Sequence, residues 1–362
     1  MSSVSKLPAW TIATPIVGWF LLGGTLLGWG GPYTALVAVG LVGSVLAAVH
    51  HAEFVAHKVG EPYGTLVLAI AVTVIEVALI VSLMLAGGPS AATLARDTVF
   101  AAVMIILTGM VGICMLLGGL RHREQRFRLD GASGALVTLA AIAILTMVLP
   151  NYTETTPGPY YSGSQLAFIA LVTLVLYGTF VLVQTVRHRD YFLPRAADGT
   201  VDVEDHADPP TTKAAWASFA LLLVCLVAVV LLAKSLSGPM EVVLEKMGAP
   251  PALLGIIIAS VVLMPEGLAA ARAARANRLQ NSINLALGSA LASIGLTIPT
   301  VAVLSLSFGW TLALGLDAKA TVLLVLSLFL ATISFSTGRT TILQGVVHLV
   351  LFAVYLFTTI VP

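Results

Sequence analysis

Long apolar runs alternate with short polar segments along the chain. Runs bounded by a charged residue, Pro or Gly lie at 10–28, 34–49, 64–87, 97–119, 133–150, 164–186, 214–234, 251–270, 284–308, 321–335 and 341–361. Most approach the ~20 residues that a helix needs to cross ~30 Å of hydrocarbon, and the short runs are expected to extend into their flanks. The pattern predicts an all-α polytopic membrane protein with eleven transmembrane helices.

The composition supports this class and excludes several others. Apolar residues make up 58% of the chain and charged residues 10%, whereas soluble proteins carry roughly 25% charged residues. A cytosolic enzyme, a nucleic-acid binder and a disordered regulator are therefore excluded. No Walker loop, dinucleotide fingerprint or G-x-S-x-G motif is present, so we expect neither ATP-driven pumping nor a cofactor. Cys114 and Cys225 lie inside apolar runs and are expected to be buried thiols rather than a disulfide.

Positive charges fall mostly on one side of the predicted helices. The side that holds the N-terminus has fourteen Lys and Arg residues: Lys6, Lys58, Arg121, Arg123, Arg126, Arg128, Arg187, Arg189, Arg195, Lys213, Arg272, Arg275, Arg278 and Arg339. The opposite side has four: Arg96, Lys234, Lys246 and Lys319. Because Lys and Arg accumulate on the cytoplasmic side, we expect the N-terminus in the cytoplasm and the C-terminus outside, with the basic loops contacting membrane lipid. No cleavable signal is evident, so the first run is expected to be retained.

The two halves of the chain are similarly spaced. Helices predicted to start at 34, 64, 97, 133 and 164 are matched by helices starting at 214, 251, 284, 321 and 341, at offsets of 177 to 188 residues. Five helices per half is an odd number, so the second half must enter the membrane from the opposite side. We expect an N-terminal helix (1–33), a first repeat (34–186), an acidic cytoplasmic linker (187–213) and an inverted second repeat (214–362).

Two acidic residues, Glu76 and Glu266, lie in the middle of predicted spans, 190 residues apart. A carboxylate at that depth costs ~3 kcal/mol on insertion scales, so the presence of one in each half indicates a functional role. Hard cations bind oxygen ligands, and a carboxyl removed from water keeps its proton unless a cation replaces it. We therefore predict one midplane metal-ion and proton site that contains both glutamates. The alternative is a pair of protonated acids that only bond neighbouring helices.

Further oxygen ligands are expected on the same and paired helices. Thr73 precedes Glu76 by one helical turn, and Thr108, Ser289 and Ser293 lie in the next helix of each half. Each of these hydroxyls could instead satisfy a local carbonyl. Pro265 is expected to break the backbone hydrogen-bond ladder next to Glu266 and expose carbonyl ligands, or else to be an ordinary kink. The glycines of these helices are explained by close packing.

Three stretches around these residues carry a family resemblance. They read GEPYGTLVLAIAVTVIEVALIVSLM (60–84), MPEGLAAARAARANRLQNSINLALGSALASIGLTIPTVAV (264–303) and ISFSTGRTTILQGVVHLVLFAVYL (333–356). The chain resembles the calcium/cation antiporter superfamily in its cation/proton exchanger branch, closest to the bacterial ChaA-type antiporters that exchange sodium, potassium or calcium for protons. The resemblance covers essentially the whole chain.

The resemblance implies one extra N-terminal helix plus two inverted five-helix repeats in a bacterial inner membrane. It implies that Glu76 and Glu266 are the glutamates of the two repeat motifs, and that the helices at 34–49 and 214–234 slide as gates against a core. That core would hold the helices at 64–87, 97–119, 251–270 and 284–308. Many members have Asn where this chain has Thr73 and Leu263. Loss of these amide oxygens favours monovalent transport over strong calcium selectivity.

Two polar segments have several interpretations. His50, His51, Glu53 and His57 lie at the cytoplasmic end of a predicted helix. They could sense pH, since His titrates near neutrality, form an entry funnel for cations, or be a solvated helix end. The acidic linker is either a solvated connection or, as the resemblance implies, a cation-sensing segment.

These features predict a secondary active antiporter that exports Na⁺, K⁺ or Ca²⁺ in exchange for protons. A passive cation channel is the main rival, because it could use the same buried carboxylates without coupling two fluxes. An intramembrane metal-dependent hydrolase using His50, His51 and Glu53 is a second rival from another class.

Overall fold

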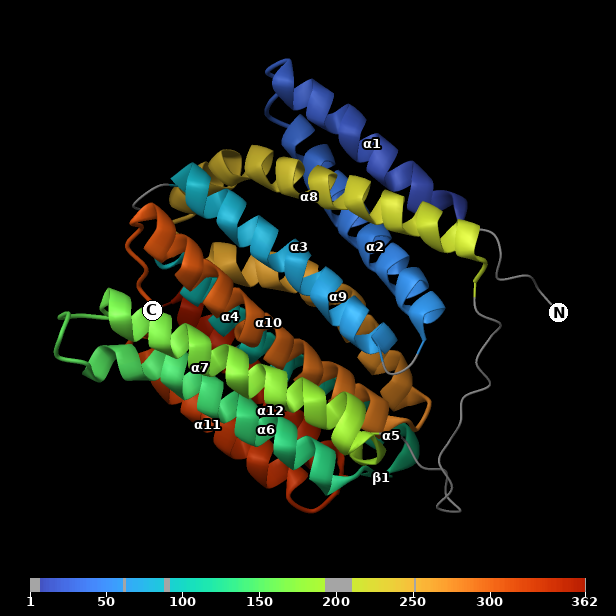
Figure 1. The fold of residues 1–362 in the computed structure, drawn as a ribbon, viewed down its shortest axis with the longest axis vertical. Coiled ribbons are helices and arrows are strands. Elements are labelled where there is room, and N and C mark those ends of the chain that lie inside the picture. Colours follow the sequence, from blue (N-terminus) through green and yellow to red (C-terminus); the bar gives the residue numbers. More distant parts are fainter. Residues whose placement is uncertain (1–6, 61–62, 88–91, 193–209, 251, 362) are drawn as a thin grey trace. The chain divides into compact units, whose positions relative to one another are not determined.

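A computed structural model describes residues 7–60, 63–87, 92–192, 210–250 and 252–361. Within these residues the chain is almost entirely helical, apart from one pair of two-residue strands, and all eleven predicted spans are helices. Ten of them are long and apolar enough to cross a membrane, and the remaining one contains a shorter apolar stretch, Ile70–Leu85. The protein is thus a multi-pass, all-α membrane protein, and its helices group into two compact units (Figure 1).

The first unit holds four helices drawn from both ends of the sequence. They are α1 (Ala9–Leu26), α2 (Tyr33–Val59), α3 (Tyr63–Gly87) and α8 (Thr212–Lys246). Helix α2 packs against the other three, and α3 also packs against α8. Buried apolar side chains of α1, α2 and α8 form its core: Leu22, Val37, Ala228, Leu232 and Leu236.

The second unit holds the remaining seven spans. Three are interrupted: α4 (Leu94–Met104), η2 (Ile105–Met110) and α5 (Val111–His122); α6 (Leu129–Ala143), η3 (Ile144–Val148) and η4 (Leu149–Tyr152); and α7 (Gly163–Leu182), η5 (Val183–Arg187) and η6 (Arg189–Tyr191). Four are continuous: α9 (Ala252–Arg275), α10 (Leu279–Phe308), α11 (Ala318–Phe335) and α12 (Ile342–Ile360). Helix α10 is central and packs against α4, α5, α6 and α7.

Glycines allow α12 to approach the α4–η2–α5 span closely. A Cβ built at Gly345 would lie 2.6 Å from the backbone nitrogen of Leu116, and one at Gly112 would lie 2.9 Å from the Leu349 side chain. At Gly109 the ring of Phe352 fills the space, at 3.4 Å. Close packing is therefore the role of Gly109 and Gly112, as the sequence predicted.

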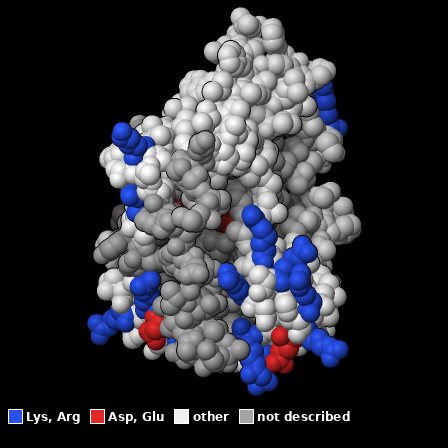
Figure 2. Space-filling model, turned by 90° about the vertical axis from the view of Figure 1, so that its right-hand side faces the viewer, with Lys and Arg blue, Asp and Glu red and all other residues white. Residues whose placement is uncertain are grey.

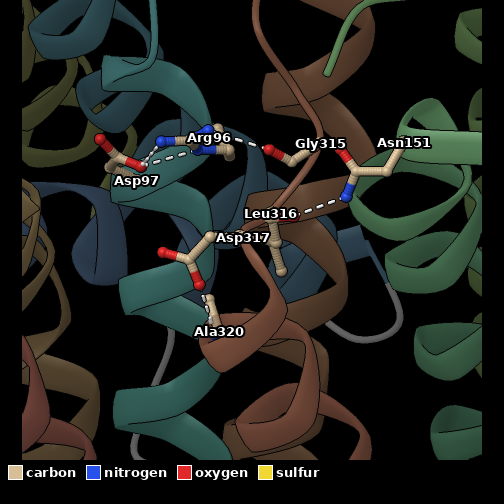
Figure 3. A network of polar contacts seen from close by, with 7 residues as sticks. All are labelled: Arg96, Asp97, Asn151, Gly315, Leu316, Asp317 and Ala320. Atoms are coloured by element: carbon tan, nitrogen blue, oxygen red, sulfur yellow. Dashed lines mark hydrogen bonds and ion pairs between the residues drawn. The ribbon is translucent and has the colours of Figure 1, made fainter. Parts of the chain in front are cut away.

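An ion pair and two hydrogen bonds to buried carbonyls lie at one end of the second unit. The guanidinium of Arg96 contacts Asp97 Oδ1 at 2.8 Å and donates to the carbonyl of Gly315 at 2.9 Å (Figure 3). Asn151 Nδ2 donates to the carbonyl of Leu316 at 2.5 Å. The segment that precedes α11 is buried, and these side chains satisfy two of its carbonyls.

Arginines gather at the other end of this unit. The strands β1 (Gln125–Arg126) and β2 (Arg339–Thr340) pair antiparallel and place Arg126 opposite Arg339. Gln125 Nε2 donates to the carbonyl of Ala274 at 2.8 Å, which holds the end of α9 beside this strand pair. Figure 2 shows Lys and Arg side chains collected toward the lower end of the face in view.

Several boundaries and one prediction differ from the sequence analysis. Helix α2 continues to Val59 and α8 to Lys246, beyond the apolar runs. Helix α9 runs from Ala252 to Arg275 and continues through Pro265. The missing N–H of Pro265 still removes the usual partner of the Val261 carbonyl, four residues earlier. Helix α3 is grouped with α2 and α8, whereas the family resemblance implied a place in the core.

Candidate cation site

Glu266 lies in α9 and its side chain is 7% exposed. The helix is fixed on both sides of this residue. A Cβ built at Gly255 would lie 3.0 Å from the backbone of Asp97 in α4, and the hydroxyl of Ser282 in α10 donates to the carbonyl of Ala270 at 2.7 Å. Glu266 is thus an acid buried inside an apolar helix that α4 and α10 hold in place, which is the environment expected of a functional intramembrane carboxyl.

The π-helical turn η2 lies beside the segment that carries Glu266. A Cβ built at Gly267 would lie 3.6 Å from the methyl group of Met110, the last residue of η2. Thr108, in the same turn, is fully buried, and its hydroxyl donates to the carbonyl of Met104 at 2.5 Å. The hydroxyl of Thr108 therefore satisfies a carbonyl of its own span, which was the alternative stated for these hydroxyls. Its oxygen keeps lone pairs that could bind a cation.

The candidate hydroxyls of α10 lie on a helix that packs against η2. Ser293 is buried, at 2% exposure, and Ser289 is half-buried. Gly295, two residues beyond Ser293, packs against the ring of Tyr177 in α7. The second unit therefore brings Glu266, Thr108 and the two serines onto three helices that contact one another.

Glu76 and Thr73 lie in the first unit, on α3. Glu76 is 3% exposed, and Thr73 is buried one helical turn before it. Apolar side chains on the same helix, Ile75 and Ile80, are also buried. Each glutamate is thus a buried acid in its own unit, in a span with apolar neighbours, as the sequence predicted.

The histidine segment of α2 has two kinds of position. His51 is fully buried, with Nε2 3.1 Å from the carbonyl oxygen of Thr11 in α1 and Nδ1 3.4 Å from the hydroxyl of Ser218 in α8. His50 packs against Trp10, with ring centroids 5.5 Å apart, whereas Glu53 and His57 are exposed. His51 therefore joins three helices. A role in pH sensing or cation entry stays a prediction for this segment.

Most of the acidic linker lies outside the described residues, including Asp198, Asp202, Glu204, Asp205 and Asp208. Asp190, at its start, pairs with Arg128 at 3.6 Å. Arg128 also lies over the ring of Tyr191, 5.1 Å from its centroid. The beginning of the linker is thereby docked on the N-terminal end of α6. No three His, Cys, Asp or Glu side chains within the described parts of the chain are grouped to hold a metal ion.

The sequence analysis overlooked His348 and the π-helical turn that it contacts. His348 lies in α12, is fully buried, and has Nδ1 2.8 Å from the carbonyl oxygen of Leu107 in η2. A histidine inside an apolar span is itself a signal, because ionisable residues are rare there. The π-helical turn had no such signal, since its residues fit a regular helix equally well.

Comparison with known proteins gives consistent matches over the whole chain. The model of the sodium/calcium exchanger protein family matches residues 20–186 and 217–361. The protein y4hA of Sinorhizobium fredii is 49% identical over 99% of this chain and 98% of its own length. The sodium-potassium/proton antiporter ChaA of Escherichia coli is 39% identical over 89% of this chain and 87% of its own length.

Solved structures share the fold. The structure of native YfkE superposes with a TM-score of 0.74, at 18% identity, and covers 98% of this chain and 100% of that one. The crystal structure of the H⁺/Ca²⁺ exchanger CAX has a TM-score of 0.72, at 15% identity, and covers 96% of this chain and 87% of that one.

Proposed function

Because the chain belongs to the sodium/calcium exchanger protein family, we propose that it is a cation/proton antiporter that exports Na⁺, K⁺ or Ca²⁺ in exchange for protons. The resemblance read from the sequence is confirmed at this level, and the family is one of secondary transporters rather than enzymes. The 39% identity to a sodium-potassium/proton antiporter supports proton coupling and monovalent cargo. More distant relatives include a Ca²⁺/H⁺ antiporter of Aphanothece halophytica, 24% identical over 74% of this chain, which keeps Ca²⁺ among the candidates.

The observation that carries the proposal is the burial of Glu76 and Glu266 inside apolar helices. A carboxyl in such a place is neutral when protonated, and a cation can exchange for its proton without any covalent chemistry. We propose that both glutamates serve one cation and proton site, with hydroxyl oxygens of Thr73, Thr108, Ser289 and Ser293 as further ligands. Competition for the site couples the two fluxes.

The transport cycle follows from that competition. Protons entering from outside neutralise Glu76 and Glu266, and the neutral site turns to the cytoplasm. A cytoplasmic cation then displaces as many protons as it carries positive charges, so that the site stays neutral, and is carried out. An occupied or fully protonated site can turn, whereas a bare pair of carboxylates cannot, because uncompensated charge is costly in a low-dielectric interior. This rule is what separates an exchanger from a leak.

We propose that the chain consists of two inverted repeats, 34–186 and 214–362, after an N-terminal helix. The family model matches both halves, and the odd number of helices in each half requires opposite orientations. The sequence asymmetry of fourteen to four in Lys and Arg supports a cytoplasmic N-terminus in a bacterial inner membrane.

The ligand set supports monovalent cargo over strong calcium selectivity. Thr73 offers a hydroxyl one turn before Glu76, but Leu263 offers no oxygen at the corresponding place before Glu266. Ca²⁺ takes six to eight oxygen ligands, often from several carboxylates and amide or backbone carbonyls, and this ligand set lacks the amide oxygens. We therefore expect the half-saturating concentration for exchange to be lower for Na⁺ or K⁺ than for Ca²⁺.

Transport in everted membrane vesicles tests the proposal. Vesicles acidified by respiration are given NaCl, KCl or CaCl₂, and dequenching of a pH dye reports proton exit. We expect the wild type to respond and Glu76→Gln and Glu266→Gln each to lose exchange. Glu154→Gln, at an exposed acid in a loop, is the matched control and should respond like the wild type. Exchange retained in either buried variant would remove that residue from the site.

The same vesicles separate the antiporter from a channel. An antiporter uses an imposed proton gradient to accumulate the cation against its own gradient, which a passive cation channel cannot do. Accumulation of ²²Na⁺ that collapses on addition of a protonophore is the expected result. Uptake that follows only the cation gradient and the membrane potential would favour the channel.

A further inference from the structure

The π-helical turn η2 leaves one buried backbone carbonyl without its usual partner inside the helix. In a regular helix the Leu107 carbonyl accepts from the N–H of Val111, four residues later. Here the Val111 N–H bonds to the carbonyls of Ile106 and Thr108 instead. A π-helical turn is rare and often marks a functional position. The Leu107 carbonyl thus lacks the donor it has in a regular helix and can accept from a donor on another element.

His348 is that donor. Its Nδ1 lies 2.8 Å from the Leu107 carbonyl oxygen, and because a carbonyl only accepts, Nδ1 must carry the proton. Its Nε2 lies 3.1 Å from the hydroxyl of Ser334 in α11, which can donate to the bare ring nitrogen. The neutral imidazole is thus fully satisfied in one tautomer, and one side chain joins α11, α12 and η2.

The turn held by His348 is the one that lies beside Glu266. Thr108 follows Leu107 directly, and Met110 reaches the position next to Gly267. Close contact between Gly112 and the Cβ of His348, at 3.1 Å from a Cβ built at the glycine, fixes the ring against the same span. Movement of the Leu107 carbonyl would therefore turn Thr108 and shift the wall next to Glu266.

We propose that His348 is a positioning residue for cation binding: its Nδ1–H holds the η2 carbonyl of Leu107 and thereby sets the orientation of Thr108 beside the Glu266 segment. The inference rests on the proposed function of the Glu266 site. It assigns His348 no contact with the cation and no proton of the exchanged pair. The role is one of geometry, carried by a single hydrogen bond.

Purified protein in proteoliposomes tests this with the half-saturating concentration of Na⁺, K⁺ and Ca²⁺, measured by dye dequenching. His348→Leu removes the donor, and we expect that concentration to rise about tenfold for the transported cation, on the scale of one buried carbonyl left unsatisfied. His348→Asn returns an N–H near Nδ1 and should stay within about twofold of the wild type. Thr146→Val is the control, because it removes a buried hydroxyl at η3.

A double variant separates positioning from general damage. If His348 acts through η2, Thr108→Val and His348→Leu together should be no weaker in cation affinity than the worse single variant. Multiplying effects would overturn the inference, as would a His348→Leu protein that reaches the membrane in reduced amount with unchanged cation affinity. Exchange retained by Glu266→Gln would instead overturn the proposed function, so the two failures are distinct.

Discussion

Replacing Gly345 with Ala should destabilise the second unit by an amount that the structure sets. The new Cβ would lie 2.6 Å from the backbone nitrogen of Leu116, 3.0 Å from its Cα and 3.1 Å from the carbonyl oxygen of Gly112. All three are backbone atoms, so no side chain can rotate away and α12 must separate from α5. Overpacking of this kind costs about 1–3 kcal/mol.

A maleimide dye that fluoresces on reaction with thiols gives the assay. Both cysteines are buried, and Cys114 lies in α5, so thermal unfolding of the second unit exposes a thiol that reacts with the dye. At about 2–4 °C per kcal/mol for a unit of this size, we expect the apparent melting temperature in detergent to fall by roughly 2–12 °C.

Gly134→Ala is the matched control. Gly134 is an exposed glycine in α6, and a Cβ built there meets no atom within 4 Å. Because Ala favours helix by about 1 kcal/mol over Gly, this variant should melt at the wild-type temperature or slightly above it. A Gly345→Ala protein that melts as high as Gly134→Ala would refute the close backbone approach.

Two further predictions concern the first turn of α4 and the loop that precedes α7. Asp97→Asn leaves the half-buried guanidinium of Arg96 without its counter-charge and should lower the free energy of unfolding by about 1–3 kcal/mol, measured in the dye assay. The double variant Arg96→Gln/Asp97→Asn should recover part of this loss. An equal loss of stability in both variants would contradict an ion-pair role. Burial raises the pKa of Tyr161 to about 12 from 10, so the unfolded chain ionises first and stability should fall as pH rises from 10 towards 12. In Tyr161→Phe the decrease of stability between pH 10 and 12 should disappear. Loss of the hydrogen bond to the Leu145 carbonyl should also lower the free energy of unfolding by about 1 kcal/mol at neutral pH. An unchanged decrease of stability at alkaline pH would show that other ionisable groups cause it.

The eleven helices were predictable because a span must be apolar over most of its length. Their ends were not. Helix α2 continues through His51 and Lys58 to Val59, where polar side chains are compatible with a helix but invisible to a count of apolar residues. Helix α8 likewise continues past Lys234. Hydropathy detects the part of a helix that must lie in lipid, and the remainder depends on packing.

The candidate site was predictable only at residues whose burial in a membrane has an unfavourable free energy. Glu76 and Glu266 stood out because a buried acid is expensive, and both are buried. Pro265 removes one backbone hydrogen bond, but the other bonds of α9 remain and the helix continues through it. His348 was overlooked because one histidine barely changes the hydropathy of a nineteen-residue helix.

Similar spacing of the helices in the two halves of the chain does not predict which unit each helix belongs to. Helices α2 and α8 start at corresponding places in the two halves and share the first unit, yet α3 and α9, which carry Glu76 and Glu266, belong to different units. One residue gives a physical reason. Gly255 lets α9 meet the backbone of Asp97 and Thr98, with a built Cβ at only 3.0 Å. The residue 190 positions earlier in the sequence is Thr65 rather than a glycine. A glycine that α9 uses for close packing therefore has no counterpart at the matching position of the first half, a difference that similar spacing does not reveal.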